Sequence, residues 1–255
     1  MDRKEAASRA FKMSFMDARN RVHNAVLLAG AVMLLSLPMF YYQYAHMMRP
    51  VFAHAPTLKQ LKLLALGQSI ILFAPALVCS LVGFLYYERL GLPGPGRLGE
   101  LKRWVPLSLL LGLALIVPSY YLTDRHMLAV FPEAYPRPWA WALAWAAGNS
   151  LSQEVVARFG LLSIGVYLLR WRGHKGHPAA AIAVVSLFAA VCSLLFFQRL
   201  GLSGLIEPRR ALASLALVFG VQWVLCEVYV RKGLAASLCL HLGLSARLVV
   251  YCFIR

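Results

Sequence analysis

The sequence predicts an all-α membrane protein, a polytopic bundle of seven to eight transmembrane helices. Hydrophobic residues make up 60% of the 255 residues and charged residues only 14%, whereas a soluble domain carries about 25% charged residues. Several apolar runs reach the roughly 20 residues that cross a bilayer as a helix. These runs are unbroken, while the strands of a membrane β-barrel alternate in polarity. A helical bundle is therefore the membrane-spanning architecture that fits.

The apolar runs divide the chain into a basic N-terminal segment, residues 1–22, and a single transmembrane helical domain, residues 23–255. The basic segment alternates charged and apolar residues and is expected to form an amphipathic helix at the inner membrane face. We expect membrane spans at about residues 24–46, 64–87, 104–122, 139–171, 178–197, 211–230 and 233–253.

The run from 139 to 171 is longer than one span requires. As one straight helix it would be roughly 50 Å long, against the ~30 Å of the hydrocarbon core. The sequence Gly148-Asn149-Ser150 is the expected kink or break within it. If two spans meet there, the bundle has eight spans; if an interfacial helix leads into one span, it has seven.

The net charge of +16 does not indicate a nucleic-acid partner. Most Lys and Arg residues lie in short loops and at the ends of apolar runs, where they orient helices in the membrane. The basic N-terminal segment and the cluster of Arg89, Arg97, Lys102 and Arg103 are both expected on the cytoplasmic side. The five cysteines all lie within apolar runs without metal-finger spacing, so no disulfide framework is expected.

The stretch Gln153-Glu154-x-x-x-Arg158 places a carboxylate and a guanidinium inside an apolar run. Residues four apart lie on one face of a helix, so Glu154 and Arg158 can touch. A charged residue at membrane depth costs at least ~2.5–3.5 kcal/mol on insertion scales, so it marks a site, a pathway or a pairing requirement. The simplest alternative is a buried ion pair that only holds one helix in place.

Two further motifs lie on later spans, Phe188-x-x-x-Cys192 and His241-x-x-x-Ser245. Each has a structural alternative: Cys192 can be a small packing residue, and His241 can be an interhelical hydrogen-bonding residue. Arg247 is also deep in an apolar run, where it can extend to the interface or pair with a carboxylate such as Glu227.

The order and spacing of the three motifs resemble those of the CPBP (Abi) family, intramembrane proteases that include the type II CAAX prenyl endopeptidases. The family pattern is Glu-Glu-x-x-x-Arg, then Phe-x-x-x-His, then His-x-x-x-Asn, on successive helices of a mainly eight-helix bundle. The resemblance covers about residues 135–253. Glu154, Arg158, Phe188 and His241 match the pattern.

The chain departs from the family pattern at three positions: Gln153 replaces the first Glu, Cys192 the second-motif His, and Ser245 the Asn. In the family the first Glu and the second-motif His activate the attacking water, and the third-motif His and Asn stabilise the oxyanion. The resemblance therefore implies an oxyanion role for His241, with Ser245 at i+4 as a second donor. The residues that would activate water are replaced.

Three arrangements would restore the missing chemistry. Glu154 could serve as the base if Arg158 does not hold it as a structural pair. Cys192 could act as a nucleophile if the helices bring it within hydrogen-bond reach of His241. Alternatively, Glu154, Cys192 and His241 could bind a zinc ion whose open fourth position holds a water, so the expected cofactor is zinc or none.

The resemblance implies an intramembrane endopeptidase that cleaves near the C-terminus of membrane-associated or lipidated proteins. Its expected partners are membrane lipids and a membrane-protein or lipidated-peptide substrate, and its expected location is a bacterial plasma membrane. The alternative from another class is a catalytically inactive homologue that acts as a membrane scaffold or immunity-type binding protein. A small-solute transporter fits less well, because the sequence shows no inverted repeat and few intramembrane charges.

Overall fold

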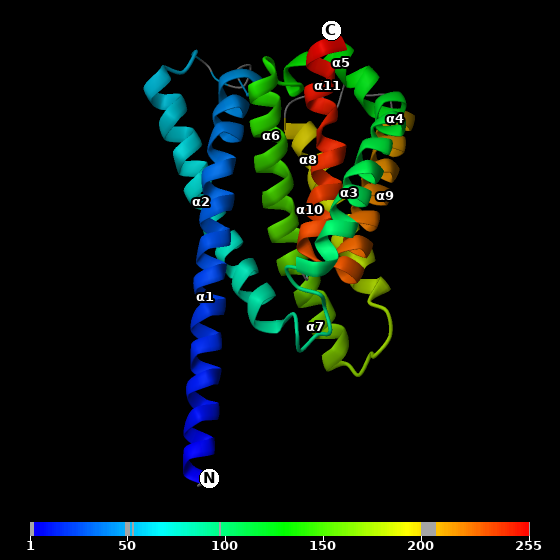
Figure 1. Cartoon of the computed structure of the whole chain (residues 1–255). Coiled ribbons are helices and arrows are strands. Elements are labelled where there is room, and N and C mark those ends of the chain that lie inside the picture. Colours follow the sequence, from blue (N-terminus) through cyan, green and yellow to red (C-terminus); the bar gives the residue numbers. More distant parts are fainter. Residues whose placement is uncertain (1–2, 49–51, 53, 97, 200–207, 255) are drawn as a thin grey trace.

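The computed structural model describes residues 3–48, 52, 54–96, 98–199 and 208–254, and the regular structure of these residues is helical throughout (Figure 1). The elements in chain order are α1 (Arg3–Tyr42), α2 (Leu58–Tyr86), α3 (Leu98–Ala114), α4 (Ile116–Ser119), α5 (Arg125–Val130), α6 (Trp139–Gln153), α7 (Ser163–Trp171), α8 (Ala179–Arg199), α9 (Pro208–Lys232), α10 (Leu234–Ser245) and α11 (Arg247–Ile254). Three π-helical stretches, Gln43–Met47, Tyr120–Asp124 and Glu154–Leu162, and a short 3-10 turn, Pro132–Ala134, complete the helical structure.

These elements build an integral membrane protein, as the composition predicts. Within the described residues, six continuous helices are long and apolar enough to cross a membrane: Ala18–Met47, Leu58–Tyr86, Lys102–Val130, Trp139–Trp171, Ala211–Lys232 and Leu234–Phe253. A seventh, α8, has a shorter described apolar part, Ala179–Ser193. Large apolar side chains such as Ile71 and Phe253 are 65% and 75% exposed on the outer faces of the bundle, where a lipid environment satisfies them.

The expected break at Gly148-Asn149-Ser150 does not occur. The fourth apolar run, or fourth crossing, is one continuous helix from Trp139 to Trp171, so no second span begins at this point. Together with α8, the described residues therefore hold seven helical runs, of which six are long and apolar enough to cross a membrane. Gly148 is a contact residue, because a Cβ added there would lie 2.4 Å from the carbonyl oxygen of Leu35 on α1. Small residues let helix backbones approach this closely inside a membrane.

The third crossing also differs from the expected one. It was expected to end near residue 122, with Asp124 and Arg125 in a loop, but the helix continues to Val130. A π-helical turn at Tyr120–Asp124 carries Asp124 into the bundle, where it is only 4% exposed. Its hydrogen bonds to two tyrosines, described below, explain why a carboxylate is tolerated there.

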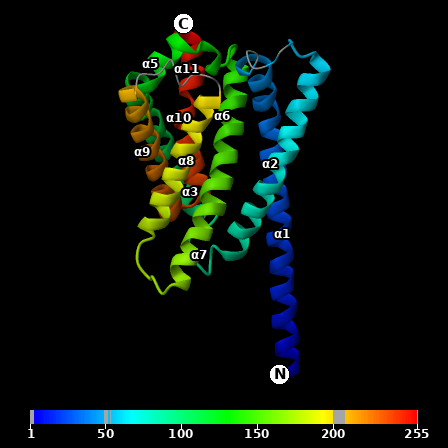
Figure 2. The same cartoon turned by 180° about the vertical axis from the view of Figure 1, so that it is seen from behind.

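The fourth crossing is the centre of the bundle (Figures 1 and 2). It lies between the α1–α2 pair on one side and the group of α3, α9 and α10 on the other, and it packs against both α1 and α10. The basic segment from Arg3 onward belongs to the same helix as the first span, and this half of α1 extends beyond the rest of the bundle.

The loop after α2 lies at the same end of the bundle as the N-terminal part of α1. Arg21 on α1 bonds Glu88 at 2.6 Å (Nη2–Oε2) and so ties the two segments together. The hydrogen bond from Arg21, with a second one from Tyr87, lowers the pKa of the Glu88 carboxyl. The same loop holds the start of α10, because the Leu234 N–H donates to the carbonyl oxygen of Gly94 at 2.9 Å.

Helices α3 and α10 cross at a pair of glycines, and this contact carries a stability prediction. A Cβ at Gly112 would lie 2.2 Å from the Leu240 carbonyl oxygen, and one at Gly243 would lie 2.5 Å from that of Leu109. We expect Gly112→Ala to destabilise the bundle by about 1–3 kcal/mol, the usual cost of overpacking.

Thermal unfolding of the purified protein measures this effect. Gly30→Ala on α1 is the matched control, because nothing lies within 4 Å of a Cβ at that position and alanine is the better helix former. The control should unfold at the same or a higher temperature. Equal unfolding temperatures for the two variants would show that α3 and α10 do not meet at this glycine.

Candidate functional site

Glu154 is the centre of a fully buried polar cluster between the fourth crossing and α10. Its side chain is 0% exposed. One carboxylate oxygen, Oε1, lies 2.9 Å from Nδ1 of His241, and the other, Oε2, accepts a 2.6 Å hydrogen bond from the Ser237 hydroxyl. Ser237 and His241 are one turn apart on α10, so the glutamate bonds two successive side chains of one helix face.

Arg158 makes the contact with Glu154 that the i, i+4 spacing predicts. Nη1 of Arg158 lies 3.4 Å from Oε1 of Glu154, and both side chains are fully buried. The same nitrogen donates to the backbone carbonyl of Gln153 at 3.3 Å, and Nη2 donates to Oε1 of Gln222 on α9. Arg158 therefore joins the fourth crossing to α9, while Glu154 joins it to α10.

The pair occupies a π-helical stretch, Glu154–Leu162, rather than an α-helix. π-Helical turns are rare and occur frequently at functional sites. Seven of its nine residues are buried, including Gly160, where a Cβ would lie 2.3 Å from the Cβ of Cys79 on α2. The irregular helix is thus enclosed by its neighbours, which lets it keep a polar pair within a membrane-spanning segment.

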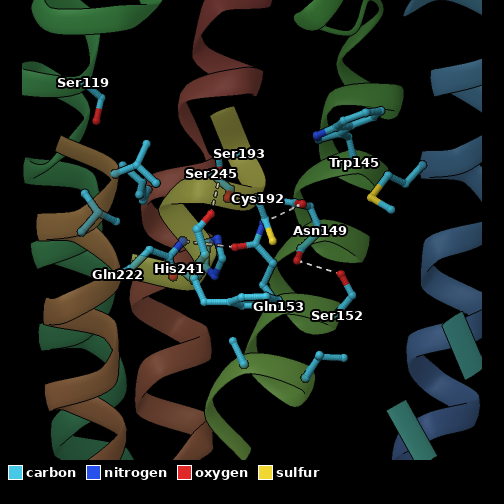
Figure 3. A pocket seen from close by; sticks show the side chains of 18 of the residues that line it. Ser119, Trp145, Asn149, Ser152, Gln153, Cys192, Ser193, Gln222, His241 and Ser245 are labelled. Carbon is cyan, nitrogen blue, oxygen red and sulfur yellow. Dashed lines mark hydrogen bonds between the residues drawn. The ribbon is translucent and has the colours of Figure 1, made fainter. Parts of the chain in front are cut away.

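A cavity of about 560 Å³ lies beside this cluster, within the 300–1,000 Å³ range of small-ligand sites. Gln153, Cys192, His241 and Ser245 all line it, so the structure brings four of the six predicted site residues to one space (Figure 3). Its apolar walls include Leu72, Val156, Leu161, Phe188, Leu217 and Val221. Glu154, which bonds His241, and Arg158 are not among the lining residues.

Gln153 belongs to a chain of amide groups along the cavity wall. Its Nε2 donates to Oδ1 of Asn149 at 3.0 Å, and its Oε1 accepts from Nε2 of Gln222 at 3.3 Å. Both ends of the Gln153 amide are therefore engaged, and an amide cannot take up a proton as a carboxylate does. At this position the chain has a positioning group in place of a base.

His241 has the arrangement of an oriented imidazole. With Nδ1–H donating to the Glu154 carboxylate, the neutral ring carries its lone pair on Nε2. His241 lines the cavity, and its Nε2 makes no hydrogen bond with any described residue. The ring therefore presents a proton acceptor to the cavity. Ser245, one turn further along α10, is fixed by a 3.1 Å contact between its hydroxyl and that of Ser150.

The described residues form none of the three arrangements that the sequence suggested as replacements for the missing catalytic residues. Glu154 has hydrogen bonds on both oxygens and does not reach the cavity. Cys192 lines the cavity, but the described residues show no hydrogen bond between its thiol and His241. No group of three His, Cys, Asp or Glu residues in the described chain is placed to hold a metal ion, so Glu154, Cys192 and His241 do not fit zinc.

Arg247 pairs with Asp124 and not with Glu227. Its Nε lies 3.2 Å from Oδ2 of Asp124. The same oxygen accepts a hydrogen bond from Tyr251 at 2.9 Å, and Oδ1 accepts one from Tyr135 at 2.7 Å. Glu227 instead lies near the opposite end of the bundle, where Arg231 bonds it at 3.2 Å. Arg247 is the one Lys or Arg among the residues described as lining the cavity.

Sequence reasoning missed several members of the site. Asn149, Gln222, Ser237 and Asp124 all bond functional side chains, yet none belongs to the three motifs. Two of them carried a usable signal: Gln222 is an amide in a long apolar run, and Ser237 precedes His241 by one helical turn.

Comparison of the chain with protein-family models, curated proteins and solved structures gives no match.

Proposed function

We propose that the chain is an intramembrane endopeptidase of the CPBP type, acting near the C-terminus of membrane-associated or lipidated proteins. One observation carries the proposal: a buried carboxylate fixes Nδ1 of His241 and leaves Nε2 facing a 560 Å³ cavity inside a membrane bundle. The motif resemblance over residues 135–253 points to the same class. The apolar walls suit an extended apolar segment, and the proposed location is a bacterial plasma membrane.

In this mechanism His241 is the general base. Nε2 takes a proton from a water molecule as the water attacks the carbonyl carbon of the peptide bond, and the proton passes to the leaving amine when the C–N bond breaks. Glu154 acts as a positioning residue: it fixes the tautomer and stabilises the imidazolium that forms. His241 thus takes the base role in place of the oxyanion role that the resemblance implies.

Two neutral donors line the same cavity and suit the negative charge that develops on the carbonyl oxygen. They are the side-chain amide of Asn149 and the hydroxyl of Ser245. Fixed dipoles of this kind stabilise an oxyanion strongly in a site that excludes bulk water. Glu154 and Arg158 join the fourth crossing to α10 and α9 through their hydrogen bonds to Ser237, His241 and Gln222.

A second function is favoured by a separate observation. Gln153 and Cys192 replace the two residues that activate water in the family, and the Gln153 amide is fully engaged by Asn149 and Gln222. This is the arrangement expected of an inactive homologue whose cavity binds a membrane partner as a scaffold or immunity-type protein.

A comparison of protein C-termini separates the two functions. Mass spectrometry of membrane and secreted proteins would be compared in cells with the intact gene, with a deletion, and with His241→Ala. His54→Ala is the matched control, because His54 is exposed in a loop. We expect one set of proteins to keep full-length C-termini in the deletion and in His241→Ala only. Unchanged C-termini in the deletion would reject the protease and favour the binding protein.

A further inference from the structure

The cavity lies mainly in one half of the bundle along the membrane normal. On α10 and α11 its lining begins at His241, after the first turns of α10. On α8 it begins at Phe188, and on α9, which runs the other way, it ends at Gln222. From the third crossing it takes Ser119 and Thr123, beyond the middle of that helix. The fourth crossing lines the cavity from Trp145 to Leu161 and so reaches slightly past its own midpoint, but most of the lining lies between the middle of the bundle and the end that holds α11.

The other half of the bundle is closed by packed side chains. A core cluster of buried residues fills the space between the fourth crossing, α8 and α9 there, and it includes Phe159, Leu162, Ile182, Val185 and Tyr229. Phe159 packs edge-on against Phe84 of α2 at a centroid distance of 4.9 Å. Leu90 and Leu92 of the loop after α2 belong to the same cluster. The cavity is thus blocked toward the end at which α1 begins.

The charge distribution distinguishes the two ends. Basic residues flank helices at both ends of the bundle. They are Arg89, Lys102, Arg103, Arg170, Arg172, Lys175, Arg231 and Lys232 at the blocked end, and Lys59, Lys62, Arg125, Arg137, Arg209 and Arg247 at the other end. The blocked end differs because it also carries the basic N-terminal part of α1. Lys and Arg beside membrane spans are retained on the cytoplasmic side, and the first helix usually dominates the orientation. Figure 1 shows that α11 ends at the opposite end of the bundle from the start of α1, which in this orientation is the exoplasmic side.

We propose that the cavity is loaded from the exoplasmic half of the membrane. Its substrate is then an apolar peptide segment presented from the outer leaflet or the exoplasmic surface, and not a prenylated tail in the cytoplasm. That the ligand is a substrate rests on the proposed function, but the direction of access rests on the position of the cavity and on the charges alone. Arg247 lies at this end, where a long cationic side chain can reach the polar interface.

Cys192 provides a native probe of this access, because it lines the cavity and is exposed. Right-side-out spheroplasts and inside-out vesicles would be treated with a charged, membrane-impermeant methanethiosulfonate reagent. Modified cysteines would be identified by mass spectrometry, with Cys192→Ala as the background. Two loop variants report orientation: Arg137→Cys at the α11 end, and Lys175→Cys in the loop between α7 and α8.

We expect Cys192 and Arg137→Cys to react at least roughly tenfold faster in spheroplasts, because the hydrocarbon core excludes a charged reagent. Lys175→Cys should show the reverse preference. Reaction of Cys192 from the cytoplasmic side, or from neither side, would overturn the proposal, as would a reversed pattern for the two loop variants. The measurement needs no cleavage, so a protein without proteolytic activity can still confirm or reject the direction of access.

Discussion

Purified protein carrying His241→Ala should cleave its substrate roughly 10²–10⁴-fold more slowly than the unaltered protein, the usual contribution of a general base. The loss follows because Nε2 of His241 is the proton acceptor that faces the cavity and both oxygens of Glu154 are already engaged. The measurement is kcat/KM in lipid vesicles, on a peptide taken from a protein whose C-terminus depends on the intact gene.

Two companion variants test the assigned roles. Glu154→Gln should keep a hydrogen bond to Ser237, but its amide can donate to Nδ1 of His241 and turn the ring into the tautomer that carries a proton on Nε2. It should therefore lose most of its rate while remaining folded. Cys192→Ala should keep most of its rate, since the nucleophile in the proposed mechanism is water and not the thiol. A rate lost in Cys192→Ala and kept in His241→Ala would contradict the mechanism.

The sequence leaves the number of spans at seven or eight, but the order and approximate positions of the membrane helices could be predicted from hydropathy because each is a continuous apolar run. The interior of the fourth crossing could not. Gly148 has the composition of a helix break, but it is a contact with Leu35 of α1, more than a hundred residues away in the chain. Such a contact cannot be predicted from neighbouring residues in the chain, and neither can the π-helical geometry of Glu154–Leu162.

Contacts within one helix of the site could be predicted from the sequence, whereas contacts between helices were missed. The contact of Glu154 with Arg158 follows from spacing alone. The hydrogen bonds of Glu154 to Ser237 and of Arg158 to Gln222 depend on α10 and α9 lying beside the fourth crossing. The spacing of residues within one motif does not show which helices lie beside it.

Residues that differ from the family pattern lie in a different part of the structure from two of those that match it. Gln153, Cys192 and Ser245, which depart from the family pattern, all line the cavity, while Glu154 and Arg158, which match it, lie behind the wall. Only Phe188 and His241 both match the pattern and line the cavity. Glu154 and Arg158 thus belong to the packing frame behind the cavity, and the positions that depart from the pattern are concentrated where a ligand would be contacted.

Removing the Glu154 carboxylate from its buried pair with Arg158 should have the largest effect on stability. Glu154→Ala leaves the Arg158 guanidinium buried without its counter-charge, and breaking a buried pair in this way typically costs about 3–5 kcal/mol. Arg158→Met leaves Glu154 with Ser237 and His241 as hydrogen-bond partners, so it should cost less. Equilibrium unfolding of the two variants in a detergent–denaturant series measures both effects.

The double variant, Glu154→Leu with Arg158→Met, distinguishes a structural ion pair from two independent groups. Replacing both charges by apolar side chains of similar size removes the desolvation cost together with the attraction, and such replacements are often neutral or stabilising. We expect the double variant to be more stable than Glu154→Leu alone, and the cycle of Glu154→Leu, Arg158→Met and the double variant to give an interaction free energy of about 0.5–3 kcal/mol. Additive losses would show that the two side chains, although 3.4 Å apart, do not stabilise each other. If the cycle shows coupling, the double variant should also fold without cleaving, because His241 then lacks the carboxylate that fixes its tautomer.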